Sequence, residues 1–157
     1  MTGVYGGIGA EERRAGRRAR LIEAALDLLG SESWQATTVR GICARAKLTP
    51  RYFYESFPDR DALLIAVFDE IVQESATVVL EAVAGAADDA RAKSHAAIAA
   101  FVELVTDDPR KARVLFAEAI GSEPLAKRRL HTLQMFAQLV SDQAGAFYEL
   151  TDTRGSR

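Results

Sequence analysis

The sequence predicts an all-α protein. Apolar residues recur at helical spacing in successive stretches, and capping residues, glycines and prolines separate these stretches. No stretch shows the sustained alternation of polar and apolar residues that predicts a half-buried β-strand. The chain has 157 residues, of which 48% are hydrophobic and 27% charged, as in globular domains. That length fits one domain, or a small domain joined to a second helical one.

Few residues could support catalysis. His95 and His131 lie far apart in the sequence and lack the spacing of a metal-binding pair such as H-E-x-x-H, and no glycine-rich phosphate loop is present. Cys43 is the one cysteine, so we expect a small packing residue in a reducing, cytoplasmic compartment. No run approaches the ~18 consecutive apolar residues of a membrane span. We therefore expect no enzyme, no catalytic residue, no metal, no cofactor and no membrane partner.

The charges are divided unevenly along the chain. Residues 1–60 carry ten basic and seven acidic side chains, whereas residues 61–157 carry ten and fifteen. Much of the positive charge of the first 60 residues lies in an arginine cluster near the N-terminus. The cluster is either a solvated helix face or an arm that binds phosphates and releases their counterions. The cluster alone leaves both interpretations open. Its members are Arg13, Arg14, Arg17, Arg18 and Arg20.

The first helix is expected at residues 13–29. Four glycines within the first ten residues predict a flexible lead before it, and Gly30 is a candidate cap at its end. Trp34, in the connection that follows, is expected to fill the edge of the core. The apolar face of this helix consists of Leu21, Ile22, Ala25, Leu28 and Leu29.

Two short helices follow. The first, at residues 38–46, begins with two candidate caps, Thr37 and Thr38. A tight turn at Lys47 leads to the second, at residues 49–57, where a threonine can cap and the proline after it suits the first helical position. The residues expected to face inward are Ile42, Cys43, Ala46, Phe53 and Phe57.

Longer helices complete the prediction. A helix capped by Asp59 carries apolar residues at helical spacing, namely Leu63, Leu64, Val67, Phe68, Ile71 and Val72. A helix that begins at Asp88 or Asp89 is expected to bury Ile98, Phe101, Val102 and Val105. The next helix is expected to start around Pro109 and to run through Ile120. The last runs to about Leu150, and its apolar stripe consists of Leu130, Leu133, Phe136 and Val140.

Two short helices joined by a tight turn have the form of a helix-turn-helix. At 1.5 Å per residue the second helix is about 12 Å long, which suits the width of the DNA major groove. Arginine can bond guanine edges, and tyrosine hydroxyls can bond phosphates. The alternative is a solvated surface with half-buried rings. The exposed face of this helix is expected to carry Arg51, Tyr52, Tyr54, Glu55 and Ser56.

Three stretches carry one combined pattern: RLIEAALDLLG at 20–30, TTVRGICARA at 37–46 and LTPRYFYESFPDRDAL at 48–63. The pattern resembles the DNA-binding domain of the tetracycline-repressor (TetR) family over about residues 15–75. The resemblance implies a helix-turn-helix domain joined by a long fourth helix to a helical ligand-binding and dimerisation domain, incomplete here. We accordingly expect a flexible basic arm at 1–14, the DNA-binding domain at 15–75 and the effector-binding and dimerisation domain at 76–157.

The resemblance also implies which residues touch DNA. Positions at the start of the second helix touch phosphates or bases, those at the start of the third read the major groove, and Tyr54 bonds a phosphate. Arg60 lies at the start of the fourth helix, whose N-terminus favours a phosphate. The implied DNA-binding residues are Thr38, Arg40, Thr49, Pro50, Arg51, Tyr52, Tyr54 and Arg60.

The family implies a transcriptional regulator, most often a repressor whose binding to a double-stranded operator is modulated by a small-molecule effector. Candidate pocket residues are apolar side chains that could equally form a packed core; they are Phe101, Val105, Phe116, Leu133 and Phe136. The alternative function is a truncated helical module that binds a ligand or a protein without specific binding to DNA.

Four residues depart from the family pattern, among them Glu55 and Ser56, which replace bulkier groups common in the family. Lys47 stands where glycine is common, which costs about 1 kcal/mol if the turn is left-handed. Gly41 lies inside a helix, where other residues are more stabilising. Glu55 would repel a phosphate, so it either faces the amino group of a cytosine or points away from DNA.

The family forms homodimers through two further C-terminal helices, and this sequence ends after what resembles the seventh helix. A stable interface usually covers at least about 1,000 Å². The stripe that contains Leu130, Leu133, Phe136 and Phe147 is also needed by the core of the domain. Either dimerisation uses other helices, or the chain is a truncated product. Because one narrow stripe cannot serve both the core and an interface, we expect a monomer at low micromolar concentration.

Overall fold

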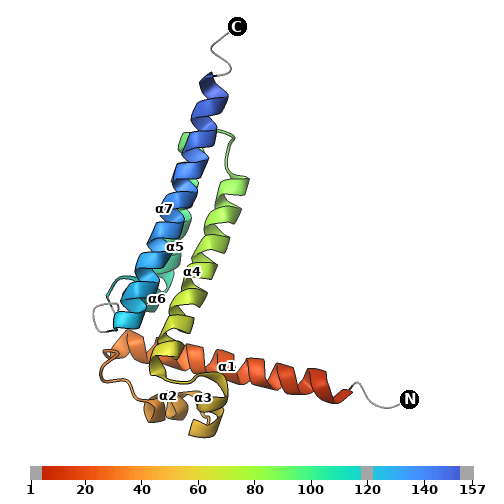
Figure 1. The fold of residues 1–157 in the computed structure, drawn as a ribbon, viewed down its shortest axis with the longest axis vertical. Coiled ribbons are helices and arrows are strands. Elements are labelled where there is room, and N and C mark those ends of the chain that lie inside the picture. The colour runs from red at the N-terminus through yellow and green to blue at the C-terminus, as the bar shows by residue number, and fades with distance from the viewer. Residues whose placement is uncertain (1–4, 118–121, 153–157) are drawn as a thin grey trace.

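The structure is a computed structural model that describes residues 5–117 and 122–152, with side chains for residues 9–117 and 122–138. Every regular element in these residues is a helix, so the predicted all-α class is confirmed. Figure 1 shows an L-shaped molecule. One arm holds α1 (Tyr5–Ser31), α2 (Val39–Ala46) and α3 (Pro50–Ser56). The other holds α4 (Arg60–Gly85), α5 (Ala90–Asp107), α6 (Pro109–Phe116) and α7 (Glu123–Asp152).

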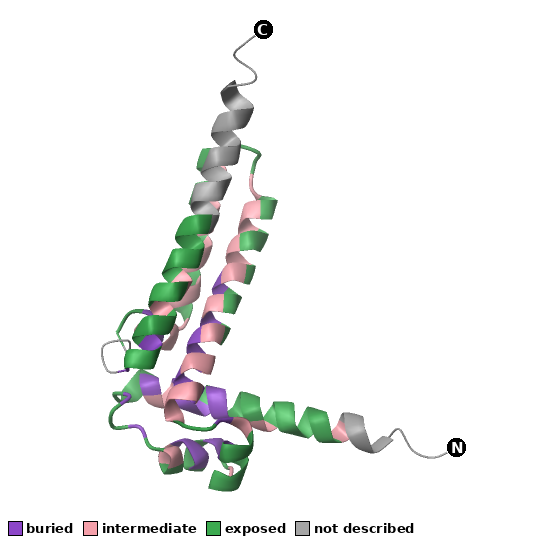
Figure 2. Cartoon of the chain, viewed as in Figure 1, coloured by how far each residue is buried: buried purple, intermediate pink, exposed green. Residues whose placement is uncertain are grey.

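Helix α1 is longer than the sequence predicts. It begins at Tyr5, so residues 5–12 are helical and the predicted start at residue 13 is wrong. Extending an existing helix adds one hydrogen bond per residue, which offsets the about 1 kcal/mol that each glycine costs. This part of α1 projects beyond the rest of the molecule, and residues 10–14 are exposed (Figure 2). Gly30, expected as the cap, lies inside the helix, which ends at Ser31.

The core lies where the two arms meet. The predicted inward residues of α1 to α4 are buried there, with Leu28 and Val72 half-buried at its margin. Trp34 is buried as expected, and its indole N–H donates to the Asp61 carboxylate at 3.2 Å. Cys43 is buried, and burial raises the pKa of its thiol. These contacts confirm the predicted packing of the N-terminal helices.

The outer helices bury less than predicted. No residue of α5 is buried, and the side chains of Ile98 and Val102 are 66% and 51% exposed. Phe101 and Val105 are half-buried against the core. Helix α6 ends at Phe116 rather than at Ile120, which lies outside the described residues. The predictions of buried Ile98 and Val102 are therefore wrong, because periodicity marks an apolar face but does not supply a neighbour to cover it.

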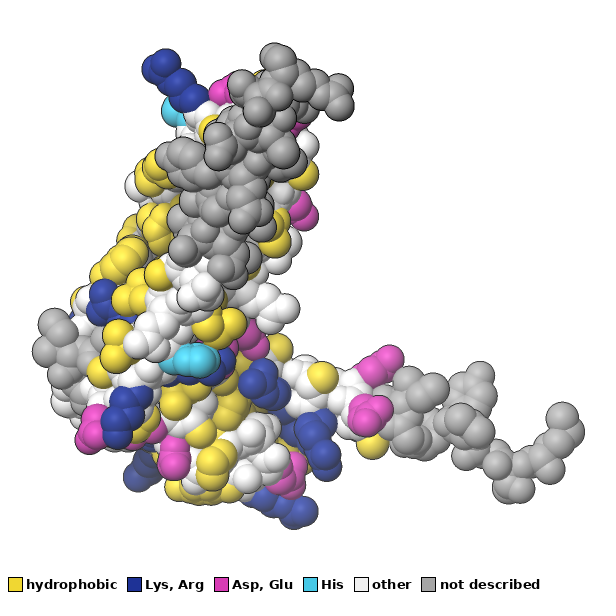
Figure 3. Space-filling view, turned by 45° about the horizontal axis from the view of Figure 1, so that its top comes forward, with side chains coloured by type: hydrophobic (Ala, Val, Ile, Leu, Met, Phe, Trp, Pro, Cys, Tyr) yellow, Lys and Arg dark blue, Asp and Glu magenta, His cyan; other side chains and the backbone are white. Residues whose placement is uncertain are grey.

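Helix α7 shows the same difference. Leu130, Leu133 and Phe136 are exposed, whereas the sequence places them in the core; Val140 and Phe147 lie outside the described side chains. Figure 3 shows hydrophobic side chains at the surface along this arm. The weak dimerisation expected from the sequence rested partly on a competing demand of the core for this stripe. Because the core leaves these side chains exposed, that reason no longer applies. The monomeric state stays a prediction, which measurement of the molecular mass by sedimentation at several concentrations tests.

No described helix combines the length and the apolar character that crossing a membrane requires.

Candidate nucleic-acid interface

The interface begins with the cap of α2. Thr38 is the N-cap, and its hydroxyl oxygen accepts the Gly41 N–H at 3.0 Å. A Cβ atom at position 41 would lie 3.3 Å from that oxygen, which is a tight contact. The glycine therefore leaves room for the cap. Thr37, the other candidate, is buried and donates its hydroxyl proton to the Ser33 carbonyl.

The turn between α2 and α3 is left-handed. Lys47 has φ 53° and ψ 46°, and it is the one non-glycine residue with positive φ among those described. Its N–H donates to the Ala44 carbonyl at 3.2 Å, and the Leu48 N–H donates to the Cys43 carbonyl at 2.9 Å. These bonds close the last turn of α2. The lysine thus has the backbone conformation in which a side chain is costly.

Arg20 of α1 stabilises the same turn. Its guanidinium donates to the carbonyl oxygens of Ala46 and Lys47 at 2.5 and 3.2 Å. These carbonyls lie at the C-terminal end of α2, where the helix dipole favours a cation. One member of the arginine cluster therefore forms hydrogen bonds within the protein.

Helix α3 is anchored by two rings and exposes its other side. Phe53 and Phe57 are buried with their ring centres 6.0 Å apart, as predicted. Tyr54 is 60% exposed, and the Arg51 side chain is 84% exposed. Ser56 is an exception to the expected exposed face, because its hydroxyl oxygen is buried and has no hydrogen-bond partner among the described residues.

Thr49 begins α3 without a hydrogen bond from its side chain, and Pro50 follows in the first turn. Both residues are exposed. The sequence predicts that the Thr49 side chain caps α3, and the structure shows no such hydrogen bond.

Three charged residues are linked on the surface of α3, and one of them, Arg17, also contacts Tyr52. The Arg17 guanidinium of α1 lies 4.5 Å from the centre of the Tyr52 ring and 3.5 Å from a Glu55 carboxylate oxygen. Arg51 donates to the other Glu55 oxygen at 3.2 Å. Glu55 is thus neutralised between two arginines on the protein surface. Neither alternative that the sequence leaves open, a base contact or a group pointing away, includes this pairing.

The arginine cluster divides into two groups. Arg18 pairs with Glu70 at 3.2 Å and lies 5.1 Å from the ring centre of Phe57, so with Arg17 and Arg20 it joins α1 to neighbouring helices. Arg13 and Arg14 lie on the projecting part of α1, are exposed, and form no ion pair with any described residue. In Figure 3 most of the basic side chains on the visible face lie at the end of the molecule that holds α1 to α3.

Two further predicted DNA contacts differ in their surroundings. Arg60 donates to the carbonyl oxygens of Trp34 and Thr37, and its guanidinium lies 5.1 Å from the Trp34 ring centre. It therefore joins the start of α4 to the connection between α1 and α2. Arg40, one residue into α2, is exposed and forms no ion pair or hydrogen bond with the described side chains.

The structure does not bring the five predicted pocket residues together. The rings of Phe101 and Phe116 meet edge to face at 6.4 Å, and Phe116 and Leu133 are exposed. A cavity of about 570 Å³ lies instead between α4 and α7, and Phe136 is the one predicted residue that lines it. No local signal in the sequence reveals this cavity, because its walls are about 60 residues apart. The lining residues are Asp69, Val72, Gln73, Arg128, Thr132, Met135, Phe136 and Gln138.

Residues 21–67 match the sequence profile described as bacterial regulatory proteins, tetR family. The chain therefore contains a tetR-family domain at these residues, which make up less than half of its length. The match covers the C-terminal part of α1, all of α2 and α3, and the start of α4. A domain of this kind indicates a DNA-binding transcriptional regulator. No curated protein sequence matches it significantly.

Solved structures share the fold of this chain. A TetR-family transcription regulator from Marinobacter aquaeolei VT8 has a TM-score of 0.64 at 19% identity, over 82% of this chain and 70% of that one. A proposed transcriptional regulator from Pseudomonas aeruginosa PAO1 gives 0.70 at 22%, over 89% and 67%. A proposed tetR-family regulator from Shewanella sp. PV-4 gives 0.69 at 20%, over 83% and 71%. The all-α arrangement of two arms is thus shared with regulators of this family.

The left-handed turn gives a stability prediction. Replacing Lys47 by glycine removes the steric cost of the left-handed backbone, which exceeds the added entropy of the unfolded chain. We expect Lys47→Gly to raise the free energy of unfolding by up to about 1 kcal/mol, measured by urea denaturation. Lys47→Ala is the matched control, since it removes the same charge and keeps the strain. Equal stabilities of the two variants would contradict the prediction.

Proposed function

We propose that this regulator binds duplex DNA by placing α3 in the major groove, with the start of α2 against the adjacent backbone. The observation that carries the proposal is the orientation of α3. Phe53 and Phe57 hold one side in the core, while Arg51 and Tyr54 extend from the other. The proposed contact residues are Thr38, Arg40, Thr49, Pro50, Arg51, Tyr52 and Tyr54.

Each proposed contact has a chemistry suited to DNA. Arg51 can donate two hydrogen bonds to a guanine edge. Its exposed pair with Glu55 contributes ~0.3–0.5 kcal/mol at most, which a base contact can replace. Tyr54 offers a hydroxyl that forms no hydrogen bond with the described residues, and Arg40 offers a cation without an ion pair among them. Arg60 is left out of the proposed set, because its guanidinium is held by backbone carbonyls.

We further propose that Arg13 and Arg14 add affinity that does not depend on sequence. Both lie on the turns of α1 that project past the core, and both lack ion pairs with the described residues. Such cations gain affinity by displacing counterions from phosphates. Arg17 and Arg18, which the sequence groups with them, are occupied by Glu55 and Glu70.

We also propose that the regulator is a repressor whose operator binding is weakened by an apolar or amphipathic small molecule. The support for this proposal is the cavity between α4 and α7, whose volume suits a small ligand. Val72, Met135 and Phe136 give it apolar walls, while Arg128, paired with Asp69 at 2.7 and 3.0 Å, lies at its margin. Helix α4 begins beside the DNA-binding helices, so a ligand there contacts an element that both arms share.

The Tyr54 hydroxyl is expected to bond a phosphate. Tyr54→Phe should weaken binding to the best duplex selected by the wild-type chain by about 1 kcal/mol, or about fivefold in Kd. The melting temperature should stay unchanged, because the hydroxyl is exposed and forms no hydrogen bond with the described residues. Unchanged affinity, measured by fluorescence anisotropy, would remove Tyr54 from the contact set.

The arginines on the projecting part of α1 are expected to set the salt dependence. Replacing Arg13 and Arg14 together by alanine should lower affinity equally for selected and unrelated duplexes, and should reduce the slope of log K against log salt by up to about 2. A matched control replaces Arg91 and Lys127, which are exposed on the other arm, and changes the net charge equally. A loss confined to one duplex sequence would indicate base readout, and an unchanged slope would return the pair to a solvated face.

The cavity is expected to be the effector site. Anilinonaphthalene sulfonate, an aromatic anion, should bind the wild-type chain and lower its DNA affinity. Thr132→Trp, which fills the cavity, should abolish both effects, whereas Thr106→Trp, on the exposed side of α5, should leave them intact. Dye binding that survives Thr132→Trp, measured by fluorescence titration, would contradict the assignment of the cavity.

A further inference from the structure

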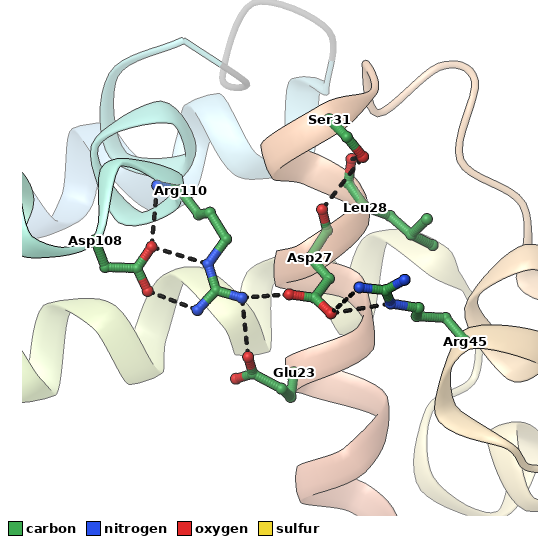
Figure 4. Close-up of polar contacts among 7 residues, drawn as sticks. All are labelled: Glu23, Asp27, Leu28, Ser31, Arg45, Asp108 and Arg110. Carbon is green, nitrogen blue, oxygen red and sulfur yellow. Dashed lines mark hydrogen bonds and ion pairs between the residues drawn. The ribbon is translucent and has the colours of Figure 1, made fainter.

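An arginine of α6 joins the two arms of the molecule. Arg110 lies in the first turn of α6, and Asp108, the cap of that helix, fixes its guanidinium by two hydrogen bonds of 2.8 and 2.7 Å. The remaining terminal nitrogen donates to Glu23 at 2.9 Å and to Asp27, both on α1 (Figure 4). One side chain therefore connects three carboxylates on two helices.

Asp27 continues this connection to α2. One of its carboxylate oxygens accepts from Arg110, and the other accepts two hydrogen bonds from Arg45 at 2.9 and 2.7 Å. Arg45 lies in the last turn of α2, two residues before the left-handed Lys47. Figure 4 shows the Asp27 carboxylate between the two guanidinium groups. Its position is thus shared between α6 and the helix that leads into α3.

The charges of this network are held in place. Hydrogen bonds from Arg45, and then those from Arg110, hold the pKa of the Asp27 carboxyl below its usual range, and Arg110 does the same for Asp108. The side chains of Asp27, Asp108 and Arg110 are each less than one third exposed. Ion pairs with partial burial and paired hydrogen bonds fix geometry better than fully exposed ones.

Gly30 makes room for this arrangement. A Cβ atom at position 30 would lie 2.8 Å from Cγ and 3.2 Å from Cδ of Arg110, closer than real side chains approach. The aliphatic part of Arg110 therefore lies directly on the backbone of α1. This contact gives Gly30 a structural role in place of the helix cap that its position in the sequence suggests.

We propose that Arg110 is a positioning residue for DNA binding, which fixes Arg45 through Asp27 and so sets the orientation of α2 beneath α1. The inference rests on the proposed function, because α2 and α3 are the helices assigned to DNA. Arg110 itself lies on the other arm, and it acts on the interface only through the shared carboxylate.

Two measurements on the full chain test the inference. The first is affinity for the duplex that the wild-type chain selects from randomised DNA. Arg110→Gln should lower this affinity by about 3- to 30-fold, and adding it to Asp27→Asn should cause no further loss, because both act through one carboxylate. Arg110→Lys keeps the charge but lacks the planar fork, so it should restore the affinity only in part.

The second measurement is hydrogen exchange of the α2 amides, which does not require DNA. Arg110→Gln should speed exchange in residues 39–46 relative to α5, since one support of α2 is lost. Lys111→Gln is the matched control, because it removes a cation from the next residue of α6 and a 2.7 Å ion pair with Glu74 of α4. It should leave both affinity and α2 exchange unchanged.

Gly30→Ala provides a variant that keeps every charge. Its methyl group must displace Arg110, so it should reproduce the direction of both effects while alanine itself favours the helix. If Arg110→Gln behaves as Lys111→Gln in either measurement, the inference is overturned while wild-type binding keeps the proposed function. If the wild-type chain selects no duplex, the proposed function fails, and the inference fails with it.

Discussion

The packing of one face of α1 is the constraint on which the rest of the structure depends. Leu21, Ala25 and Leu29 are fully buried, and α2, α3, α4 and α6 all contact this helix. Each buried leucine contributes about 1.5–3 kcal/mol, so this face supplies much of the cohesion of the N-terminal arm. Because α2 and α3 are too short to be stable alone, their orientation follows from α1. The surface offered to DNA is therefore a consequence of a hydrophobic contact on its opposite side.

The arginines of this arm fall into two groups, those that bond other parts of the protein and those that are proposed to bind DNA. Arg20 closes the turn after α2, Arg60 joins the start of α4 to the preceding connection, and Arg45 fixes α2 to α1. The guanidinium group suits these tasks because its several donors reach two acceptors at once. Arg13, Arg14 and Arg40 lack ion pairs with the described residues. A basic sequence segment is therefore not in itself a binding surface, since partners from distant helices decide which cations stay available.

The second arm is less completely packed than the first. Val114, Leu115 and Leu125 are buried near the junction, but much of the apolar face of α5 and α7 is open to solvent. Ile98, Val102 and Leu133 are exposed, although they are spaced as core residues are. The described residues thus combine an arm with a closed core and an arm whose apolar faces are only partly covered.

The sequence determined the local structure by itself. Helical periodicity, the threonine cap at Thr38, the proline after Thr49 and the cap at Asp59 are short-range features, and they placed α2, α3 and the start of α4 within a residue. The pattern of buried residues around Phe53 was equally readable, because one face of a helix must be apolar to pack. The start of α1 was not, because its glycines lower local helix propensity while the continuing helix overrides it.

Only the tertiary structure decided which side chains are available and which are occupied. The pairing of Arg18 with Glu70, of Glu55 with Arg17 and of Arg110 with Asp27 joins residues that are far apart in the chain. The cavity between α4 and α7 and the exposure of Leu130 also arise from the placement of whole helices. A sequence pattern specifies the period of a helix and the chemistry of its faces. The partner of each face depends on distances between helices, and no local pattern encodes these.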